Sequence, residues 1–450
     1  MTKVKTQKSL PVRIAIALVA GITFGLACLY TREYMMANGQ EQLWGTINRF
    51  LFQDITVEGG QNAIGLFYII GQLFVKALQV VIVPMVFTSI ALAIGKVADT
   101  KTLGRISFKT LGWFLMTSTT ALVLACIVGI FFFNQDVFSA NITGLEQSVG
   151  STGQNPLLVI LNIIPSNIIA TFSSNSAVLS IVFLAVSVGL AMSYLGHEKT
   201  STLEKIMVEI NEIVIVFLNF VVTKFAPFAI FVLLSRTFAS YGIDYLIPAL
   251  AYVVITVGLL LVFLFIGYPL LVWIGTGLNP LIFVKKILNV VIFGFSTSSS
   301  AATLPLNLET NIKRLGVSEE VASFVLPLGM TVNMDGTAIM QVIATVFIAG
   351  NAGYDVTLTS LVVIAVLALI ASAGTPAAPG AGAVILFTIL SGVGYTNDAA
   401  LLAYSLILAI NRPIEMLVTS LNVVGDSTAC LYVAKGENKL DLDVYNNQDL

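Results

Sequence analysis

Long apolar runs, separated by short basic segments, dominate the first two thirds of the chain. The first three runs cover residues 14–30, 63–94 and 110–133, and further apolar stretches continue to residue 284. A helix needs about 20 apolar residues to cross a hydrocarbon layer of about 30 Å, so each run can form a membrane span. Because the apolar residues form long blocks and not alternating segments of about ten residues, the pattern favours helices over a transmembrane β-barrel.

The composition supports this interpretation. Hydrophobic residues make up 57% of the 450 residues and charged residues only 10%, whereas soluble domains carry about 25% charged residues. The net charge of −2 offers no basis for binding nucleic acid. The three cysteines are scattered, and the single histidine, His197, excludes a histidine-based metal site or acid–base pair. We predict an all-α polytopic membrane protein with room for roughly eight spans.

Basic residues predict the orientation of the spans. Sixteen of the 22 Lys and Arg residues fall into alternate connecting segments and the two end segments, whereas the loop 134–155 contains none. Because basic residues mark the cytoplasmic side, both termini are expected inside the cell and that loop outside. The run 14–30 has no small-residue cleavage site, so we interpret it as a span and not a signal peptide. The expected location is the cell (plasma or inner) membrane.

Three later apolar segments are interrupted at their centres. Segment 287–308 is broken by the polar stretch 296–305, segment 321–350 by 333–337, and the uncharged segment 356–397 by the Gly- and Pro-rich stretch 374–382. Irregular backbone at membrane depth persists only where protein or water covers it. Paired interrupted helices are typical of the binding site of a transporter. We predict that the first and last segments form two re-entrant hairpins, which enter from opposite sides and meet near the midplane.

The last apolar run, 399–433, carries a stripe of polar residues. They follow one another at spacings of 4, 4, 3 and 4: Asn411, Glu415, Thr419, Asn422 and Asp426. These spacings put them on one face of a helix, together with Val418. A charge at the bilayer centre costs at least ~2.5–3.5 kcal/mol, so the stripe needs partners or water. Arg412 lies one residue off the stripe and could pair with Glu415 or with an acidic group elsewhere.

Asp335 stands in the second interrupted segment, next to Asn333 and Thr337. Carboxylate, amide and free carbonyl oxygens are hard donors, which suit a cation such as Na⁺. In discontinuous-helix symporters, unwound carbonyls coordinate the cation while helix N-termini face an anionic group of the substrate. The serines 298–300 at one break and the glycines of the other could present N–H groups to a substrate carboxylate.

Four motifs in this half of the chain resemble the glutamate transporter family, the dicarboxylate/amino acid:cation symporters. They are Asn-Met-Asp-Gly-Thr at 333–337, the serine-rich stretch ending in Thr-Leu-Pro at 303–305, Pro-Gly-Ala-Gly at 379–382 and Asn-Val-Val-Gly-Asp at 422–426. The resemblance covers the C-terminal half in order, and the N-terminal half fits mainly by hydropathy. It implies eight transmembrane helices plus two re-entrant helical hairpins, in an elevator-type transporter that forms a homotrimer.

The same resemblance implies a division of the chain into a fixed scaffold and a moving transport domain. The scaffold would comprise residues 1–105 (spans one and two) and 145–240 (spans four and five). The transport domain would comprise residues 106–135 (span three) and 244–435 (spans six to eight and both hairpins). Residues 436–450 would form a cytoplasmic tail.

Three sodium sites follow from the resemblance. The first would use Gly329, Asn333, Asn422 and Asp426. The second would use Thr331, Met334, Ser372, Ala373 and Thr375. The third would use Phe114, Thr117, Ser118, Asn333 and Asp335. The family usually has Tyr at position 114, so this chain keeps only the backbone carbonyl there, and Gln341 replaces a Glu of animal glutamate carriers, which argues against proton coupling.

The resemblance also implies a set of residues that bind the substrate. They are Ser298, Ser299, Ser300, Thr337, Ala377, Ala378, Pro379, Gly380, Glu415, Val418, Thr419 and Asn422. Glu415 stands where acidic-amino-acid carriers have the Asp that holds the substrate ammonium. Val418 replaces the arginine that clamps a side-chain carboxylate, and Ser298 occupies the other position known for such an arginine. A second carboxylate would therefore be desolvated without a cation, at a cost of several kcal/mol.

These departures favour a sodium-coupled symporter that imports a neutral amino acid. An acidic amino acid or C4-dicarboxylate symporter of the same family, in which Arg412 reaches the substrate, and a cystine carrier stay open as alternatives. A channel would need a continuous aqueous path, and nothing in the sequence resembles a charged or carbonyl ring filter. A membrane enzyme could use Asp335 and Asp426 as catalytic carboxylates, but no nucleophile–base set or cofactor motif accompanies them.

Overall fold

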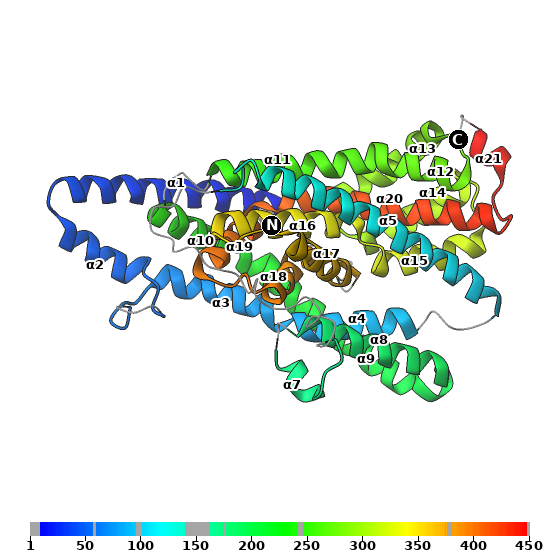
Figure 1. Ribbon diagram of the computed structural model, residues 1–450, viewed down its shortest axis with the longest axis horizontal. Helices are drawn as coiled ribbons and strands as arrows, with labels where there is room; N and C mark the ends of the chain where they lie inside the picture. Colours follow the sequence, from blue (N-terminus) through cyan, green and yellow to red (C-terminus); the bar gives the residue numbers. More distant parts are fainter. Residues whose placement is uncertain are drawn as a thin grey trace, which may run out of the picture.

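The protein is all-helical in the part that the structure describes. This computed structural model describes residues 10–56, 60–95, 101–139, 163–174, 177–241, 246–373, 375 and 380–447. The only strand-like pairing among them is an isolated bridge between Val317 and Leu440. Most helices run roughly along the longest axis, with α1 and α2 reaching one end and α21 the other (Figure 1).

The N-terminal third forms five helices. They are α1 (Leu10–Ala37), α2 (Glu41–Leu51), α3 (Leu66–Val80), α4 (Ile82–Gly95) and α5 (Lys101–Phe133). α3 and α4 divide the predicted run 63–94 at Val81, close to Pro84, which has no N–H to donate to the preceding turn. The sequence analysis missed α2, a short amphipathic helix whose one buried residue is Trp44.

The described residues in the middle of the chain form six α-helices and two π-helical turns. They are α7 (Ile168–Phe172), α8 (Val178–Leu195), α9 (His197–Phe220), η1 (Val221–Phe225), α10 (Ala226–Tyr241), α11 (Leu246–Val262), η3 (Phe263–Gly267) and α12 (Tyr268–Thr276). Pro269 follows η3 and cannot donate to the preceding turn, and Tyr268 instead donates its N–H to the Phe263 carbonyl five residues back. Single π turns inside helices occur frequently at functional sites.

The C-terminal part contains the remaining helices. They are α13 (Pro280–Thr297), α14 (Ser300–Lys313), α15 (Glu319–Val332), α16 (Asp335–Ala352), α17 (Leu358–Ala373), α18 (Ala381–Val393), α19 (Asp398–Ile410), α20 (Arg412–Gly436) and α21 (Leu442–Asn446). α15 and α16 are separated by the two residues Asn333 and Met334, so the predicted interruption of this segment is confirmed.

Eight helical segments of the described chain are long and apolar enough to cross a membrane, which confirms a polytopic membrane protein. Two of the predicted assignments differ from these eight segments. It includes Pro280–Thr297, which the sequence analysis assigned to a hairpin. The fourth predicted span corresponds instead to α8, whose apolar stretch Ser180–Leu195 is shorter than the eight.

Both predicted hairpins appear as pairs of packed helices. α13 packs against α14, and the break between them is limited to Ser298 and Ser299. It is narrower than the predicted stretch 296–305, because α14 continues through Pro305. α17 packs against α18, and residues 374 and 376–379 between them lie outside the described part. Re-entry of these hairpins into a membrane stays a prediction.

The run 399–433, expected as one helix, is interrupted at Asn411. This residue ends α19, with its N–H bound to the Ile407 carbonyl at 2.8 Å, and precedes α20. Pro413 lies in the first turn of α20, where it supplies no N–H to the last turn of α19. Asn411 therefore stands at a helix junction, and the rest of the polar stripe lies along α20.

The helices form two groups according to their packing. α1 packs along α10, α3 also contacts α10, and α4 packs along α8 and α9. In the second group, α5 packs on both α16 and α20, whereas α13 and α15 pack on α20. The two groups meet mainly where α10 contacts α19 and where α15 contacts α4.

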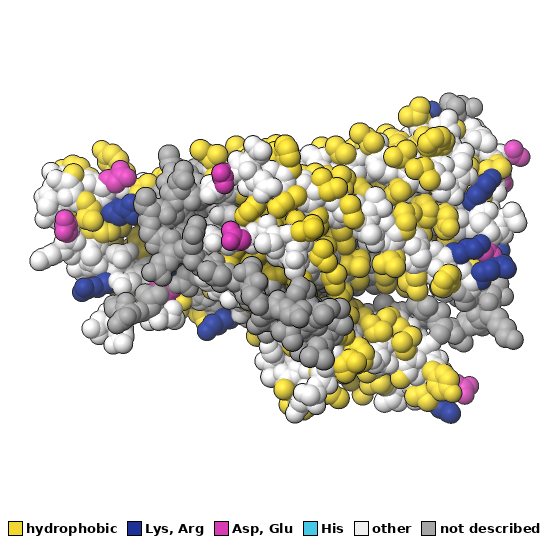
Figure 2. All heavy atoms as spheres, in the orientation of Figure 1, with side chains coloured by type: hydrophobic (Ala, Val, Ile, Leu, Met, Phe, Trp, Pro, Cys, Tyr) yellow, Lys and Arg dark blue, Asp and Glu magenta, His cyan; other side chains and the backbone are white. Residues whose placement is uncertain are grey.

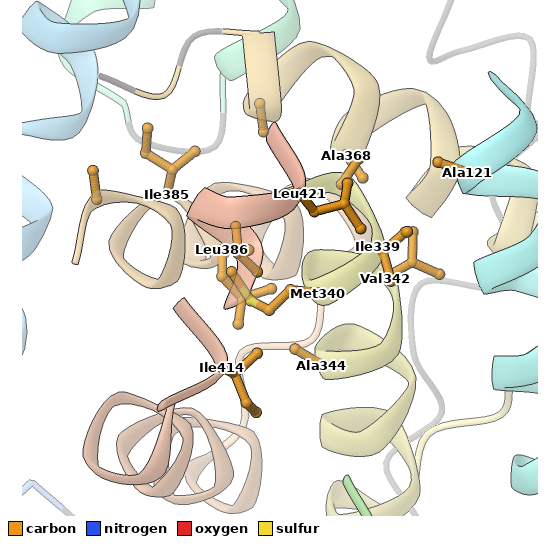
Figure 3. Close-up of a cluster of buried hydrophobic side chains, with 14 of the residues drawn as sticks. Ala121, Ile339, Met340, Val342, Ala344, Ala368, Ile385, Leu386, Ile414 and Leu421 are labelled. Atoms are coloured by element: carbon orange, nitrogen blue, oxygen red, sulfur yellow. The ribbon is translucent and has the colours of Figure 1, made fainter. Parts of the chain in front are cut away.

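The helices α16 and α20 lie at the centre of the second group. In the apolar 18-residue stretch of Glu319–Ala352, 94% of the residues are buried, and in that of Arg412–Gly436, 89%. The corresponding share for Ile16–Ala37 is 17%. Figure 3 shows part of this core, to which α16 contributes Met340 and Ala344, and α20 contributes Ile414. Polar residues of α16 and α20 are therefore held away from lipid and water.

The surface agrees with a membrane location. On the face shown in Figure 2, charged side chains lie in the left half and at the right end of the long axis, and the band between these two regions carries hydrophobic side chains. Large apolar residues such as Val254, Ile266 and Ile292 are 62–63% exposed. Contiguous exposed apolar surface of this kind marks contact with a membrane or a partner.

Candidate ion and substrate site

Two carboxylates are buried inside the second helix group. Asp335 is the first residue of α16 and 0% exposed, and Asp426 lies in α20 and is 2% exposed. Within the described residues, neither forms an ion pair with a basic side chain. Buried charges require a partner, because desolvation costs several kcal/mol per ion. A bound cation could therefore stabilise the two carboxylates.

Asp335 accepts hydrogen bonds from two different helices. The Ser118 hydroxyl of α5 donates to Oδ1, and the Tyr268 hydroxyl of α12 donates to Oδ2 at 2.8 Å. Both donors are neutral, so they satisfy the carboxylate without cancelling its charge. Ser118 was predicted at this site and Tyr268 was not.

Asn333 connects Asp426 of α20 to Thr117 of α5. Its amide nitrogen donates to Asp426 Oδ1 at 3.2 Å, while its Oδ1 accepts from the Thr117 hydroxyl at 3.4 Å. It can reach both because it occupies the extended link between α15 and α16, at φ −93° and ψ 94°. Gly329 allows the close approach of α20, because a Cβ at this position would overlap the Asp426 carboxylate.

Asn422 joins α20 to the start of α16. Its Oδ1 accepts from the Gly336 N–H at 2.8 Å, and its amide nitrogen donates to Thr337 Oγ1 and Met334 Sδ, both at 3.1 Å. A Cβ at Gly336 would lie 2.9 Å from the Val418 carbonyl, so this close packing depends on glycine.

The structure thus brings together the residues predicted for the first and third sodium sites. Phe114 belongs to this group through its backbone, because its carbonyl accepts from Thr117 Oγ1 at 3.1 Å. The ring of Phe114 faces Gly329, where a Cβ would lie 3.0 Å from Cζ. Sodium would find carboxylate, amide, hydroxyl and carbonyl oxygens here.

Among the described residues, the hydrogen bonds of the predicted second sodium site stay within single segments of the chain, as when the Thr375 N–H donates to the Ser372 carbonyl at 2.9 Å. The hydroxyls of Thr331, Ser372 and Thr375 donate to carbonyls of their own segments, at 2.9, 3.0 and 2.9 Å. α15 does pack against α17, the helix that ends at Ala373. The second site stays a prediction.

Glu415 lies at the N-terminal end of α20 and is 8% exposed. Its Oε1 accepts from the Ala383 N–H of α18 at 3.3 Å, and its Oε2 lies 3.5 Å from Arg412 Nη1. The sequence analysis left Arg412 unassigned, and the structure pairs it with Glu415. Arg412 Nε is buried and has no hydrogen-bond partner in the described part of the chain.

Two further predicted substrate residues follow this pair along α20. Val418 and Thr419 are 5% and 8% exposed, and Thr419 donates to the Glu415 carbonyl at 3.0 Å. Gly382 at the start of α18 approaches Thr337, because a Cβ there would lie 3.2 Å from Thr337 Cγ2. Gln341 of α16 also donates to the Gly382 carbonyl at 3.2 Å. The second hairpin therefore meets both α16 and α20 near the proposed site.

Two described residues at the hairpin tips have left-handed backbone. Ser298 is in the left-handed region at φ 50°, and Ser299 caps α14 by accepting from the Ala302 N–H at 3.3 Å. Ser300 begins α14 and is 6% exposed. Gly380 is also left-handed, at φ 88°, just before α18. Ala377, Ala378 and Pro379 lie outside the described residues.

A comparison with known protein families identifies the wider class. The family model described as "Sodium:dicarboxylate symporter family" matches residues 10–436. The chain belongs to this family. The predicted family resemblance is therefore confirmed, and it extends into the N-terminal half, where the sequence motifs were weak.

Individual relatives are distant but cover most of the chain. It is 29% identical over 380 residues to a proton/glutamate-aspartate symporter of Escherichia coli (82% of this chain, 85% of the relative). It is 28% identical over 381 residues to a proton/sodium-glutamate symport protein of Bacillus caldotenax (82% and 87%). It is 29% identical over 384 residues to a C4-dicarboxylate transport protein of Cupriavidus pinatubonensis (83% and 86%). The family and these relatives are transporters and not enzymes.

Proposed function

We propose that this protein is a sodium-coupled secondary active symporter that imports a neutral amino acid. The coupling ion and the substrate class rest on two separate charge arguments. One concerns Asp335 and Asp426 in the cation site, and the other concerns Arg412 and Glu415 in the substrate site.

The argument for sodium is that the partners of the two buried carboxylates in the described part of the chain are neutral. Ser118, Tyr268 and Asn333 donate hydrogen bonds to Asp335 and Asp426 and leave their negative charges in place. Protons could neutralise the same groups, and proton coupling appears in the names of two relatives. Sodium is favoured because carboxylate, amide, hydroxyl and carbonyl oxygens converge here. In addition, Gln341 cannot carry a proton, in contrast to the Glu of animal glutamate carriers at this position.

The argument for a neutral amino acid is that the substrate site is already charge-balanced. Arg412 is the basic residue that contacts Glu415, at 3.5 Å, and Val418 follows one turn later with an apolar side chain. An amino acid zwitterion with an uncharged side chain adds no net charge to such a site. A substrate with a second carboxylate adds a charge that would be desolvated without a free cation. The Arg412–Glu415 pair beside Val418 is the observation that carries this proposal.

An acidic amino acid or a C4-dicarboxylate is the second candidate. The relatives have glutamate, aspartate or C4-dicarboxylate in their names. Arg412 also has the buried, unpartnered Nε, which could turn toward a substrate carboxylate if Glu415 released the guanidinium.

For alternating access we propose an elevator movement. The scaffold would comprise residues 1–105 and 145–240, and the transport domain residues 106–135 and 244–435. The packing of α1, α3, α4, α8 and α10 with one another supports this division, as does the separate packing around α16 and α20. We also propose a homotrimer and expect a mass measurement in detergent to give three copies, whereas a stable, active monomer would contradict it.

A binding screen tests the proposed function. The purified protein is titrated with each of the twenty amino acids and with succinate, in NaCl and in choline chloride. We expect small or medium neutral amino acids to bind most tightly, and only in Na⁺. Tighter binding of aspartate, glutamate or succinate than of every neutral amino acid would overturn the substrate class. Equal binding in choline would overturn the sodium coupling.

A further inference from the structure

Tyr268 is a fully buried phenol whose hydroxyl donates to Oδ2 of Asp335 at 2.8 Å. We propose that Tyr268 is a positioning residue of the cation site. It fixes one carboxylate oxygen of Asp335 with a neutral donor and leaves the other oxygen, and the full negative charge, for the cation. This inference rests on the proposed sodium coupling and adds α12 to the elements that build the site.

The chemistry of the donor explains why a tyrosine suits this position. A lysine or arginine would also bind Asp335, but its own charge would compete with the transported cation. A neutral phenol stabilises the ionised carboxylate and leaves its charge unchanged. Hydrogen bonds to charged groups are stronger than those between neutral groups. Tyr268 can therefore hold the Asp335 carboxylate in place while the cation is absent.

The two hydroxyls on Asp335 have different freedom. Ser118 lies in the middle of α5, and its small hydroxyl can rotate from donating to Oδ1 to presenting its lone pairs to a cation. The Tyr268 hydroxyl is fixed by its ring, whose edge-to-face contact with Phe263 has a centroid distance of 4.9 Å and an angle of 69°. Oδ2 is therefore the held oxygen of Asp335, and Oδ1 is the one that can change partners.

The surrounding backbone is shaped to admit the phenol. The π turn η3 ends at Gly267, immediately before Tyr268, and Pro269 follows. On the other side, a Cβ at Gly425 would overlap the Tyr268 hydroxyl and lie 2.6 Å from Asn333 Nδ2. Gly425 thus provides space for two polar groups at once, next to Asp426. Tyr268 therefore lies between Asp335 of the predicted third sodium site and Asp426 of the predicted first site.

A purely structural role is the competing explanation, because a buried tyrosine hydroxyl normally finds a partner. Removing such a hydrogen bond would lower stability at every sodium concentration alike. A positioning role instead predicts a change in sodium affinity, because Asp335 would lose the group that orients it. Sodium dependence, and not stability alone, distinguishes the two.

The test measures sodium binding without any substrate. The melting temperature of the full-length protein in detergent is followed while NaCl replaces choline chloride at constant ionic strength, since a ligand that binds the folded state raises it by mass action. In the wild type, we expect the melting temperature to rise above a threshold sodium concentration. In Tyr268→Phe we expect this threshold to increase about tenfold, the low end for losing a hydrogen bond to a charged group.

Tyr404→Phe is the matched control. Tyr404 is 1% exposed and donates to the Val384 carbonyl at 3.2 Å, so its hydroxyl is also buried and bonded, but not to a carboxylate. This variant should melt at a lower temperature throughout, with an unchanged sodium threshold. Replacement of Tyr268 by 4-aminophenylalanine, which retains a neutral donor, should restore the wild-type threshold.

The outcomes separate the two proposals. A wild type that does not respond to sodium overturns the sodium coupling and the role of Tyr268 with it. A responsive wild type with an unchanged threshold in Tyr268→Phe overturns the positioning role alone. If Tyr268→Phe does not fold, the 4-aminophenylalanine variant decides. A wild-type threshold supports the role of the donor, and a tenfold higher threshold despite the retained donor contradicts it.

Discussion

The side-chain amide of Asn333 donates a 3.2 Å hydrogen bond to Asp426, which lies 93 residues further along the chain. Asn333 is in the break between α15 and α16, whereas Asp426 is in α20, so this bond joins two residues that were predicted for the first sodium site, and Asn333 was also predicted for the third. Thr117 donates to the same amide at 3.4 Å. Because the two predicted sites share Asn333, we expect a cation in one site to affect the other.

Asp426→Asn tests the contribution of the second carboxylate. The substitution keeps the size of the side chain but removes its charge, and Asn333 then faces a neutral amide. We expect sodium-dependent substrate binding to weaken by ~1.5–3 kcal/mol, the scale of a hydrogen bond to a charged group. The measurement is the apparent substrate Kd as a function of sodium concentration.

Glu309→Gln provides the control for loss of a carboxylate. Glu309 is an exposed residue of α14, and its partner is Lys313 at 2.9 Å. This variant should keep the wild-type sodium dependence. An Asp426→Asn protein with the same dependence as Glu309→Gln would show that Asp426 does not ligate the cation. If uptake by the wild type is unchanged when K⁺ replaces Na⁺, the sodium proposal as a whole is wrong.

Arg412→Gln tests what the Arg412–Glu415 pair does before substrate arrives. In the proposed mechanism the substrate ammonium must replace the guanidinium at Glu415. Removing Arg412 leaves Glu415 buried without its partner, at a typical cost of about 1–3 kcal/mol in the empty protein. We therefore expect a lower melting temperature without substrate, together with several-fold tighter binding of neutral amino acids. Weaker binding of all amino acids would instead identify Arg412 as a direct ligand of the substrate carboxylate.

The C-terminal segment is attached to α5 by a charge cluster. Glu437 accepts from Lys109 at 2.5 Å and from Arg105 Nε at 2.9 Å, and these bonds hold the pKa of Glu437 below its usual range. A lowered pKa means that the ionised form stabilises the fold. This contribution is complete above the ordinary pKa of about 4.3 and is lost as the pH falls through the lower, folded value.

We expect Glu437→Gln to lower the melting temperature by about 1–2 °C at pH 7, because the Arg105 side chain is 69% exposed and an ion pair screened by solvent contributes at most about 1 kcal/mol. The difference from the wild type should shrink as the pH falls below about 4.3. Melting curves of both proteins between pH 7 and about pH 3 provide the measurement, because the loss is expected below the ordinary pKa. A difference that is the same at every pH would mean that the charge of Glu437 does not act in the way described.

Much of the candidate site could be predicted because its residues contrast with their surroundings. Asn333, Asp335 and Asp426 are polar residues inside apolar runs, and burial of such groups requires a partner. The breaks at 333–334 and 298–299 were predictable for a related reason, since polar and small residues interrupt long apolar stretches there. The structure confirms both breaks and brings these three residues together.

Three other features of the site do not stand out from the surrounding sequence and were not assigned from it. Tyr268 is one of the tyrosines in an apolar segment, and only the path of α12 past the start of α16 places its hydroxyl on Asp335. The interruption at Asn411 depends on Pro413, which was overlooked because the stripe of polar residues fits one continuous helix. The Arg412–Glu415 contact depends on rotamers at the first turn of α20, and residue spacing alone left several partners possible for Arg412.

The choice of substrate offers the last prediction, through Val418→Arg. Glu415 and Val418 are three residues apart on α20, so their side chains lie one turn apart on the same face. An arginine at position 418 would add a free guanidinium, which binds carboxylates in a bidentate manner. We expect competition assays to show a shift toward aspartate, glutamate or succinate, while serine, alanine and threonine lose affinity.

The space around position 418 limits the Val418→Arg substitution, because Val418 is only 5% exposed and an arginine side chain is much larger than that of valine. The arginine could also pair with Glu415 and block the site, which would abolish binding of every substrate. Val418→Met is the matched control, since it adds length without charge. If Val418→Met binds neutral amino acids while Val418→Arg binds nothing, charge pairing with Glu415 explains the loss. If Val418→Arg still prefers neutral amino acids over acidic ones, Val418 does not face the substrate side chain, and the proposed basis of specificity is wrong.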